Sequence, residues 1–288
     1  MTDQAEPLKG RTCLVTGATS GIGEETARGL ARLGATVIVA GRNPAKCLAT
    51  VARIRRESGN PDVEYLLADL SSQAEIRALV HRFRERHDRL DVLVNNAGSA
   101  FRRRRLSADG IEMTFALNHL SYFLLTNLLL ETIKSAAPAR IVNVASNGHY
   151  ESPLDLNDLE MERDYSILKA YNRSKFANVL FTYELARRLK GTGVTANALH
   201  PGLVATNIVR HNGLLVWWGW RLYVRFRGPL TVKEGASTGI YLASSPEVEG
   251  VSGAYFVKKK QAPSDPATYD EAVARKLWEA SARLTGLS

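Results

Sequence analysis

Short apolar runs alternate with amphipathic stretches over the first 200 residues, and this alternation constrains the fold more than any other feature of the chain. Each run is bounded by glycine, asparagine or aspartate, and continuous apolar character is typical of buried parallel strands. The runs cover residues 12–15, 36–40, 63–67, 92–94, 141–144 and 194–199. Between them apolar residues recur at helical spacing, for example Ala27, Leu30 and Ala31. The sequence therefore predicts an α/β fold with one doubly wound parallel sheet and helices on both faces.

The remainder of the chain continues this pattern, so we expect residues 1–288 to form a single Rossmann-type domain. No linker, repeat or low-complexity tract divides it. Thr231 and Glu234 have the spacing of a capping box, which predicts a further helix, and residues 254–257 predict a last strand. The tail carries apolar residues at helical spacing, which predicts a packed carboxyl-terminal helix. These residues are Val273, Leu277, Ala280 and Leu284.

Cysteine usage and hydropathy exclude several classes of protein. Cys13 and Cys47 are the only cysteines and both lie in predicted regular structure, which argues against a disulfide framework and a cysteine metal site. We therefore expect no metal and a reducing, cytoplasmic location. The first ten residues contain no apolar run, so we expect neither a signal peptide nor an amino-terminal anchor. The longest apolar stretch, residues 214–220, is far below the roughly 20 residues that a membrane-spanning helix requires.

The net charge of +9 and the arginine run at residues 102–105 raise the question of nucleic-acid binding. Clustered arginines neutralise phosphates, but the interleaved aromatic residues of a base-stacking surface are missing around this run. We therefore expect no nucleic-acid partner. A solvated basic loop, or a loop that attracts an anionic ligand, is the interpretation that we favour.

A glycine-rich loop separates the first predicted strand from the first helix. It comprises Thr16, Gly17, Ala18, Thr19, Ser20, Gly21, Ile22 and Gly23. Glycines permit a tight turn and let backbone N–H groups approach a pyrophosphate at the amino terminus of the following helix. The loop predicts a dinucleotide site, although a glycine-rich turn can also be no more than a tight strand-to-helix connection.

The residues after the second strand indicate which dinucleotide binds. An acidic side chain at that place would accept from the 2′-hydroxyl of NAD and repel the 2′-phosphate of NADP. This chain has no carboxylate there, has Arg42, and carries Lys46 one helical turn later. Because a guanidinium pairs bidentately with phosphate, we expect NADP(H). An arginine that is merely exposed in a turn is the alternative interpretation.

Tyr171 and Lys175 are the candidate reacting groups. They lie four residues apart at the start of an apolar helix, so they share one face. A phenol of pKa about 10 is a poor acid–base catalyst at neutral pH, and a nearby ammonium would lower that pKa toward the useful range. Without context, a tyrosine and a lysine at this spacing are more often two neighbours on a helix surface.

Other polar residues supply that context. Ser146 follows a strand at the carboxyl edge of the sheet, where open α/β sheets bind ligands, and its hydroxyl can hold a substrate oxygen. Asn118 lies within a predicted helix, where we expect an ordered water leading to Lys175 to satisfy its side chain. Pro201 and Gly202 follow the sixth strand and would bend the chain toward the nicotinamide. The residues expected to line the coenzyme after the fourth strand are Asn95, Asn96, Ala97 and Gly98.

Together and in this order, the motifs resemble the short-chain dehydrogenase/reductase family. The matching elements are residues 16–23, Asp69 with Leu70, residues 95–98, Asn118, Ser146, Tyr171 with Lys175, and Pro201 and Gly202 with Thr206. The resemblance implies that Tyr171 donates or accepts the proton and that Lys175 tunes it and binds the ribose. It implies further that Ser146 orients the substrate and that Asn118 supports a proton relay.

The resemblance also implies further coenzyme contacts and an assembly. Asp69 would lie near the adenine with Leu70 beside it, and Thr206 would lie near the carboxamide or the phosphates. Helices that bear Asn118 and Tyr171 often form a dimer face in similar proteins, which implies a homodimer.

Within the family, three features resemble the retinol-dehydrogenase-like branch. They are the 25-residue step from Ser146 to Tyr171, residues 174–178 and residues 242–253. Membrane-bound members of that branch carry an amino-terminal anchor that we do not expect here. This departure argues against a retinoid delivered from a membrane.

Two stretches break the strand–helix rhythm, residues 147–168 and 205–230, and are candidate walls of a substrate pocket. The second contains Trp217, Trp218 and Trp220, which we interpret first as an apolar lid over a hydrophobic substrate. A core or partner-facing helix, and a shallow membrane-contact face beside neighbouring arginines, are the alternatives.

The sequence thus predicts an NADP(H)-preferring alcohol dehydrogenase or carbonyl reductase that interconverts a hydrophobic alcohol and its aldehyde or ketone. A catalytically silent NADP(H)-binding regulator of the same fold is the alternative function.

Overall fold

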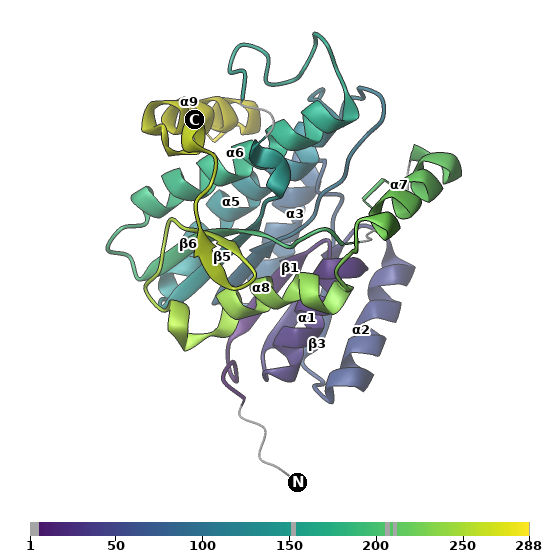
Figure 1. The fold of residues 1–288 in the computed structure, drawn as a ribbon. Coiled ribbons are helices and arrows are strands. Elements are labelled where there is room, and N and C mark those ends of the chain that lie inside the picture. Colours follow the sequence, from purple (N-terminus) through teal and green to yellow (C-terminus); the bar gives the residue numbers. More distant parts are fainter. Residues whose placement is uncertain (1–5, 151–153, 205–207, 210–211, 288) are drawn as a thin grey trace.

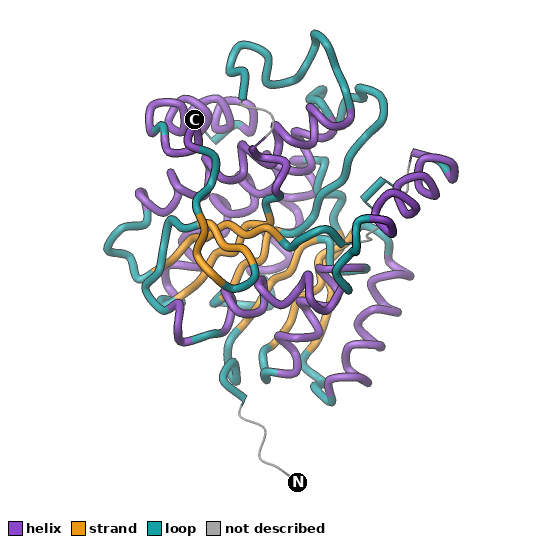
Figure 2. The backbone as a smooth tube through the Cα atoms, viewed as in Figure 1, coloured by secondary structure: helices purple, strands orange, loops and turns teal. Residues whose placement is uncertain are grey.

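A central sheet carries the helices on its two faces in the computed structural model, which describes residues 6–150, 154–204, 208–209 and 212–287 (Figures 1 and 2). Its strands are β1 (Thr12–Thr16), β2 (Thr36–Gly41), β3 (Val63–Leu67), β4 (Val92–Asn95), β5 (Ala139–Val144), β6 (Val194–His200), β7 (Tyr255–Val257) and β8 (Lys260–Ala262). They are ordered β3-β2-β1-β4-β5-β6-β7-β8, and the pairs are parallel except β7 with β8. The predicted doubly wound parallel sheet is confirmed.

Two helical layers bury the two faces of the sheet. The layer beside one face consists of α1 (Gly21–Arg32), α2 (Pro44–Ser58) and α8 (Val232–Ser244). The layer beside the other consists of α3 (Gln73–Arg84), α5 (Ser121–Ser135) and α6 (Ile167–Arg188). The remaining helices are α4 (Met113–Phe115), α7 (Leu214–Phe226) and α9 (Glu271–Thr285). Shorter helical turns occupy Ala116–Leu120, which is π-helical, and Asn147–Tyr150, Pro246–Val248 and Pro266–Tyr269.

Local signals place several of these elements where the sequence predicts them. The Thr231 side chain accepts from the Glu234 N–H and the Glu234 carboxylate accepts from the Thr231 N–H, so the capping box that starts α8 is present. β8 is the strand that the sequence analysis missed. It follows a turn in which Lys258 and Lys259 adopt φ of +50° and +64°, a conformation that asparagine and glycine normally signal in a hairpin.

The segment Met113–Ser135 is a helical stretch that is long and apolar enough to cross a membrane by length and composition. Most of this stretch is buried inside the molecule, and Tyr122, Phe123 and Leu129 belong to the core between the sheet and its neighbouring helices. Its apolar character is therefore explained by packing within the domain.

The carboxyl-terminal helix α9 packs across α5 and α6. Trp278 places its ring 4.9 Å from the ring of Phe123 and 5.8 Å from that of Phe181, centroid to centroid, and the guanidinium of Arg188 lies over it at 4.2 Å. Leu277 is buried among side chains of α6 and of the turn before α5. The predicted packed helix is confirmed. The same helix packs on α5 and α6, which the resemblance implicates in a homodimer, and the homodimer stays a prediction.

We expect Leu277→Ala to lower the free energy of unfolding by about 2–4 kcal/mol, because the substitution opens a cavity between α9 and α6. Lys276→Ala, on the exposed side of the same helix, is the matched control and should change it by less than about 0.5 kcal/mol. Urea titration at pH 7 measures both. Equal effects of the two substitutions would show that α9 is not packed as described.

Candidate active site

The catalytic candidates meet at the carboxyl edge of the sheet. Ser146 follows β5, Tyr171 and Lys175 lie in the first turns of α6, and Asn118 lies in the π-helical turn before α5. The Tyr171 hydroxyl faces the Ser146 side chain, which opposes the rise that burial causes in the pKa of the phenol. α6 begins at Ser166, whose side chain caps the helix by accepting from the Lys169 N–H at 3.2 Å. The cap fixes the start of α6. The start of the helix in turn determines which of its faces carries Tyr171 and Lys175.

Lys175 is almost fully buried, with 3% of its surface exposed. Its ammonium donates to the Val144 carbonyl oxygen at 2.8 Å. The nitrogen also lies 5.5 Å from the ring centroid of Tyr122 and 5.8 Å from that of Tyr171. Gly98 lies beside it: a Cβ at this residue would be in ordinary contact with the Lys175 nitrogen, at 3.5 Å, and in tight contact with Asn118 Oδ1, at 3.2 Å.

Burial dominates the protonation of both groups, which differs from the expectation that Lys175 lowers the pKa of Tyr171. Burial raises the pKa of the Tyr171 phenol, and the interaction with Ser146 opposes that rise. Burial lowers the pKa of the Lys175 ammonium to about 7. In the protein without coenzyme, desolvation therefore outweighs the attraction between ammonium and phenolate.

The Asn118 side chain forms its hydrogen bonds with protein groups, and the water expected beside it stays a prediction. Its Oδ1 accepts from the Ser99 N–H at 2.8 Å, and its Nδ2 donates to the Ser99 carbonyl at 2.9 Å and to Ser174 Oγ at 2.9 Å. Its own carbonyl oxygen accepts from Asn178 Nδ2 at 2.9 Å. The side chain thus ties the loop after β4 to the catalytic helix α6.

A buried polar chain that the sequence analysis missed reaches this point from α9. His119 Nε2 lies 3.0 Å from Ser281 Oγ, and His119 Nδ1 lies 3.2 Å from the amide oxygen of Asn178. Burial lowers the pKa of His119 to about 4, so the ring is neutral at pH 7. His119 directly follows Asn118 in the sequence, and this adjacency is the one signal that could have indicated its role.

Two further histidines fix the loop that carries Ser146. His149 donates from Nδ1 to the Ser146 carbonyl at 2.6 Å and accepts at Nε2 from the Asp265 N–H at 3.1 Å. His200, at the end of β6, accepts from the Asn147 N–H at 3.1 Å. Burial lowers the pKa of His200 to about 4, and burial also lowers that of His149. Both rings therefore act as neutral hydrogen-bonding groups.

The glycine loop has the shape that a bound pyrophosphate requires. Gly17 and Gly21 adopt φ of +63° and +60°, and a Cβ on Gly17 would lie 2.8 Å from the Ala97 Cα. Ser20 is the residue before α1, and its side chain forms no cap hydrogen bond. The first N–H groups of α1 are therefore available to an anion, as in dinucleotide sites. Thr19 lies in the turn, and Ile22 and Gly23 lie in the first turn of α1.

The residues after β4 divide between loop and core. Asn96 joins the glycine loop by donating to the Thr16 carbonyl at 2.8 Å, and the Ala97 N–H donates to Thr16 Oγ1 at 3.0 Å. The Asn95 side chain instead donates to Thr126 and Asn143 inside the core. Asn95 therefore supports the edge of the sheet, and its side chain does not extend toward the coenzyme as the sequence suggests.

Arg42 and Asp69 lie together at the ends of β2 and β3. Arg42 is 68% exposed and its guanidinium lies 3.3 Å from the Asp69 carboxylate. Hydrogen bonds from Ser71 and the charge of Arg42 hold the pKa of Asp69 below its usual value, although burial alone would raise it. Lys46 is exposed in the first turn of α2. Leu70 is buried in the core, so its side chain packs beneath this corner.

The segment after β6 borders the same edge. Gly202, two residues after β6 ends, adopts φ of +86°, a conformation that favours glycine, and a Cβ there would displace Leu230 Cδ1, which would lie 2.3 Å away. Thr206 lies outside the described residues, and its predicted contact with the coenzyme stays a prediction. Within residues 205–230, Leu214–Phe226 form α7, which projects from the body of the molecule in Figure 1. The core-helix interpretation of this segment is wrong, since Trp218 and Phe226 are 61% and 81% exposed.

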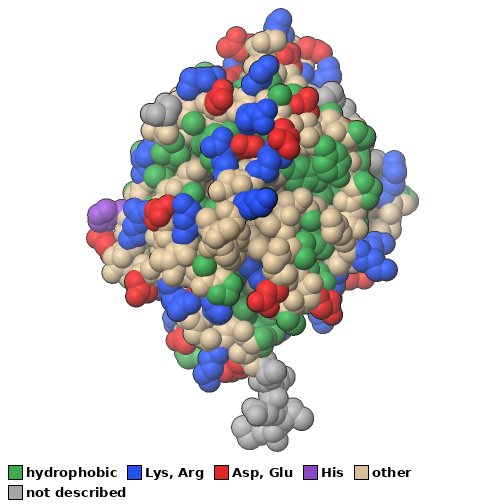
Figure 3. Space-filling view, turned by 90° about the vertical axis from the view of Figure 1, so that its left-hand side faces the viewer, with side chains coloured by type: hydrophobic (Ala, Val, Ile, Leu, Met, Phe, Trp, Pro, Cys, Tyr) green, Lys and Arg blue, Asp and Glu red, His purple; other side chains and the backbone are tan. Residues whose placement is uncertain are grey.

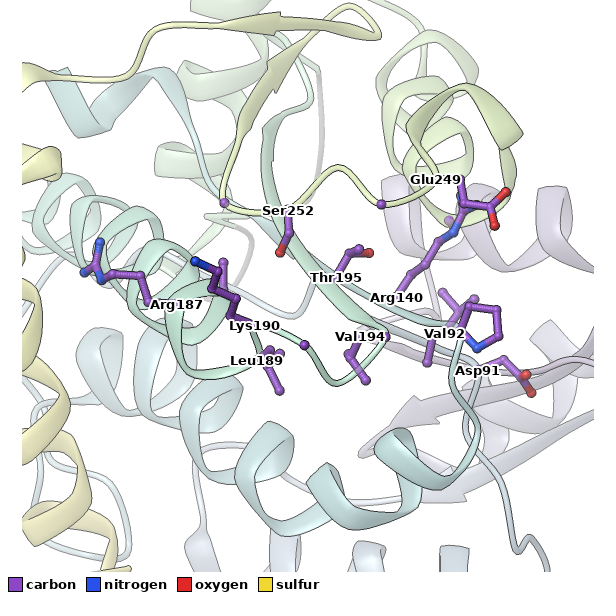
Figure 4. Close-up of a pocket in the computed structure, with 18 of the residues that line it drawn as sticks. Asp91, Val92, Arg140, Arg187, Leu189, Lys190, Val194, Thr195, Glu249 and Ser252 are labelled. Atoms are coloured by element: carbon purple, nitrogen blue, oxygen red, sulfur yellow. The ribbon is translucent and has the colours of Figure 1, made fainter.

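A hollow of about 850 Å³ lies at the opposite edge of the sheet (Figure 4). Asp91, Val92, Arg140 and Val194 line it near the starts of β4, β5 and β6, whereas open α/β sheets bind ligands at the carboxyl ends of their strands. It is therefore not the coenzyme site.

On the face drawn in Figure 3, basic and acidic side chains are interspersed, and that face shows no continuous cationic surface.

Comparisons with known proteins identify the family of the chain. A model of the short chain dehydrogenase family matches residues 11–213. Human retinol dehydrogenase 14 is 45% identical over 97% of this chain and 88% of its own length, and human polyprenol dehydrogenase is 44% identical over 98% and 87%. A crystal structure of an uncharacterised protein from Mycobacterium paratuberculosis, 33% identical, matches with a TM-score of 0.78 over 96% of this chain and 94% of that one. The resemblance to the retinol-dehydrogenase-like branch is confirmed, and the chain belongs to the short-chain dehydrogenase family.

Proposed function

We propose that the protein is an NADP(H)-dependent oxidoreductase that interconverts a hydrophobic alcohol and its aldehyde or ketone. The placement of Tyr171 beside Ser146, with the buried Lys175 nitrogen 5.8 Å from the tyrosine ring, is the observation that carries the proposal. The names of the similar proteins, retinol dehydrogenase and polyprenol dehydrogenase, support an apolar alcohol as the substrate class.

The residues of the site have separate roles in this chemistry. A bound nicotinamide coenzyme supplies or accepts the hydride. Ser146 holds the substrate oxygen, and Tyr171 donates the proton to that oxygen in reduction and removes it in oxidation. The raised pKa keeps Tyr171 protonated at neutral pH, as the reductive direction requires. Lys175 holds a positive charge beside the phenol, which favours the phenolate that forms when the proton leaves.

The preference for NADP(H) rests on the corner formed by β2 and α2. Arg42 and Lys46 are exposed cations there, and the Asn43 side chain caps the helix start. A 2′-phosphate would pair with these groups, and Asp69 holds the guanidinium of Arg42 at that place. Since Cys13 and Cys47 are buried free thiols, we also propose a reducing, cytoplasmic location.

We expect Tyr171→Phe to lower kcat for carbonyl reduction by about 10²- to 10⁴-fold and to leave the Kd for NADPH within about threefold, because it removes the proton donor and keeps the ring. A screen of NADPH oxidation over aldehydes, ketones, retinal and steroids measures the first quantity, and fluorescence titration measures the second. Turnover that survives the substitution contradicts the mechanism. Tight NADPH binding by the unmodified protein without turnover of any substrate would favour the catalytically silent regulator.

Coenzyme choice is tested at Arg42. We expect Arg42→Ala to lower kcat/KM for NADPH by about 10- to 100-fold, since a hydrogen bond to a charged group contributes about 1.5–3 kcal/mol, and to change kcat/KM for NADH little. Arg56→Ala removes a similarly exposed arginine from the far end of α2 and should leave both constants unchanged. An equal loss with both coenzymes would assign Arg42 a structural role.

The low pKa of Lys175 predicts a pH dependence. In the free enzyme the ammonium is the main form below about pH 7 and is lost as the pH rises through that value. We expect kcat/KM for NADPH, which reports groups of the free enzyme, to fall above pH 7. Lys175→Arg keeps a cation at every pH of the assay, so its profile should be lower but flat near pH 7. The same inflection in this variant would assign the titration to another group.

A further inference from the structure

An apolar stripe on the outside of α7 has no partner in the described part of the chain. Leu214, Trp218, Leu222 and Phe226 follow one another at intervals of four residues and are 73%, 61%, 56% and 81% exposed. At 3.6 residues per turn, they fall within a band of about 120° around the helix. Large apolar side chains in a continuous exposed row mark a surface that meets a partner or a membrane.

The helix is held at the rim of the active site. Before it, Asn212 accepts from the Arg102 N–H at 2.8 Å and donates to the Ala100 carbonyl at 2.7 Å. After it, the Leu230 N–H donates to the Leu203 carbonyl at 2.8 Å, next to the end of β6. On the inner side Val224 is fully buried. The stripe therefore faces outward beside the loop that carries the partners of Asn118.

The sequence segments around the stripe carry basic residues and no acidic ones. No aspartate or glutamate occurs between His200 and Glu234, or between Asp91 and Asp109. Arg225 and Arg227 are exposed at the end of α7, and Arg102 and Arg103 are exposed in the loop that is bonded to its start. Arg104 lies 3.9 Å from Glu162, so its charge is partly offset and takes no part in the argument.

We propose that α7 docks on the surface of an anionic lipid bilayer, with its apolar stripe among the lipid chains and the neighbouring arginines on the headgroups. Tryptophan, phenylalanine and leucine on one side of a helix and arginines beside them are the composition of helices that lie in a membrane interface. The inference rests on the proposed function for its purpose, because a hydrophobic alcohol dissolved in the bilayer would reach the active site directly at this rim.

The docking requires no membrane-spanning helix. α7 provides an apolar surface of its own, and a helix that rests in the membrane interface needs no spanning segment.

Vesicle co-sedimentation tests the docking without any substrate. The protein is mixed with vesicles of phosphatidylcholine alone or of phosphatidylcholine with phosphatidylserine, at 0.1 M salt. We expect binding to the anionic vesicles at least tenfold stronger than to the neutral ones, since each arginine near an anionic surface contributes about fivefold. The binding should weaken as salt is raised.

Matched variants locate the binding surface. Trp218→Ser with Phe226→Ser, and separately Arg225→Gln with Arg227→Gln, should each weaken vesicle binding at least tenfold. Leu48→Ser with Leu168→Ser removes two leucines that are 60% and 64% exposed elsewhere, and Lys276→Gln with Arg283→Gln removes two exposed cations from α9. These controls should bind as the unmodified protein does. Thermal unfolding of every variant checks that the fold is intact.

Three results would overturn the proposal. They are failure of the unmodified protein to bind anionic vesicles, binding that the two α7 variants retain in full, and self-association that the Trp218 and Phe226 substitutions abolish while vesicles stay unbound. The last would assign the stripe to contact between copies of this chain.

The docking and the proposed function fail separately. If the protein binds vesicles through α7 but reduces no carbonyl compound, the proposed function fails and the docking stands. If it reduces a water-soluble aldehyde but does not bind vesicles, the docking fails and the proposed function stands. We expect the Trp218 and Phe226 variant to lose activity on a vesicle-dissolved substrate at least tenfold more than on a soluble one.

Discussion

The buried ammonium of Lys175 is the constraint on which the active site depends. A pKa of about 7 in place of the usual value near 10.4 corresponds to roughly 5 kcal/mol of disfavoured charge, so the interior tolerates this cation only with specific partners. The Val144 carbonyl and the faces of Tyr122 and Tyr171 are those partners in the chain alone. The groups that contact the ammonium must keep their positions, because a shift of any of them leaves the charge uncompensated.

That placement reaches well beyond the catalytic residues. Asn118 ties the loop after β4 to α6, and Asn178 holds its carbonyl from the next turn of that helix. His119 and Ser281 extend the same chain of hydrogen bonds into α9. Fully satisfied buried polar networks give a rigid arrangement, whereas partly satisfied ones are costly. The carboxyl-terminal helix, remote in sequence, thus supports the catalytic one both by this chain and by the packing of Trp278.

The sequence predicts those parts of the molecule that repeat or that depend on one residue type. Strand runs, the glycine loop and the capping box at Thr231 are of this kind, because periodicity and local chemistry decide them. What it does not predict depends on residues far apart in the chain. The partners of Asn118, the direction in which burial moves the pKa of Tyr171, and the exposure of α7 arise from packing that no local pattern encodes. The hairpin at Lys258 and Lys259 was hidden for a different reason, since two lysines carry no turn signal.

The order of the strands separates two demands that would conflict in one pocket. An anionic coenzyme needs cations and free N–H groups, which lie over β1, β2 and β3 at the start of α1 and at Arg42. An apolar substrate needs a surface without exposed polar groups. The apolar residues of α7 follow β6, which lies in the other half of the strand order. The order in which successive strands are added to the sheet reverses between β1 and its parallel neighbour β4, so the reacting groups after β4 and β5 stand between the two halves. An apolar approach for the substrate and a cationic binding site for the coenzyme can therefore coexist at one edge of one sheet.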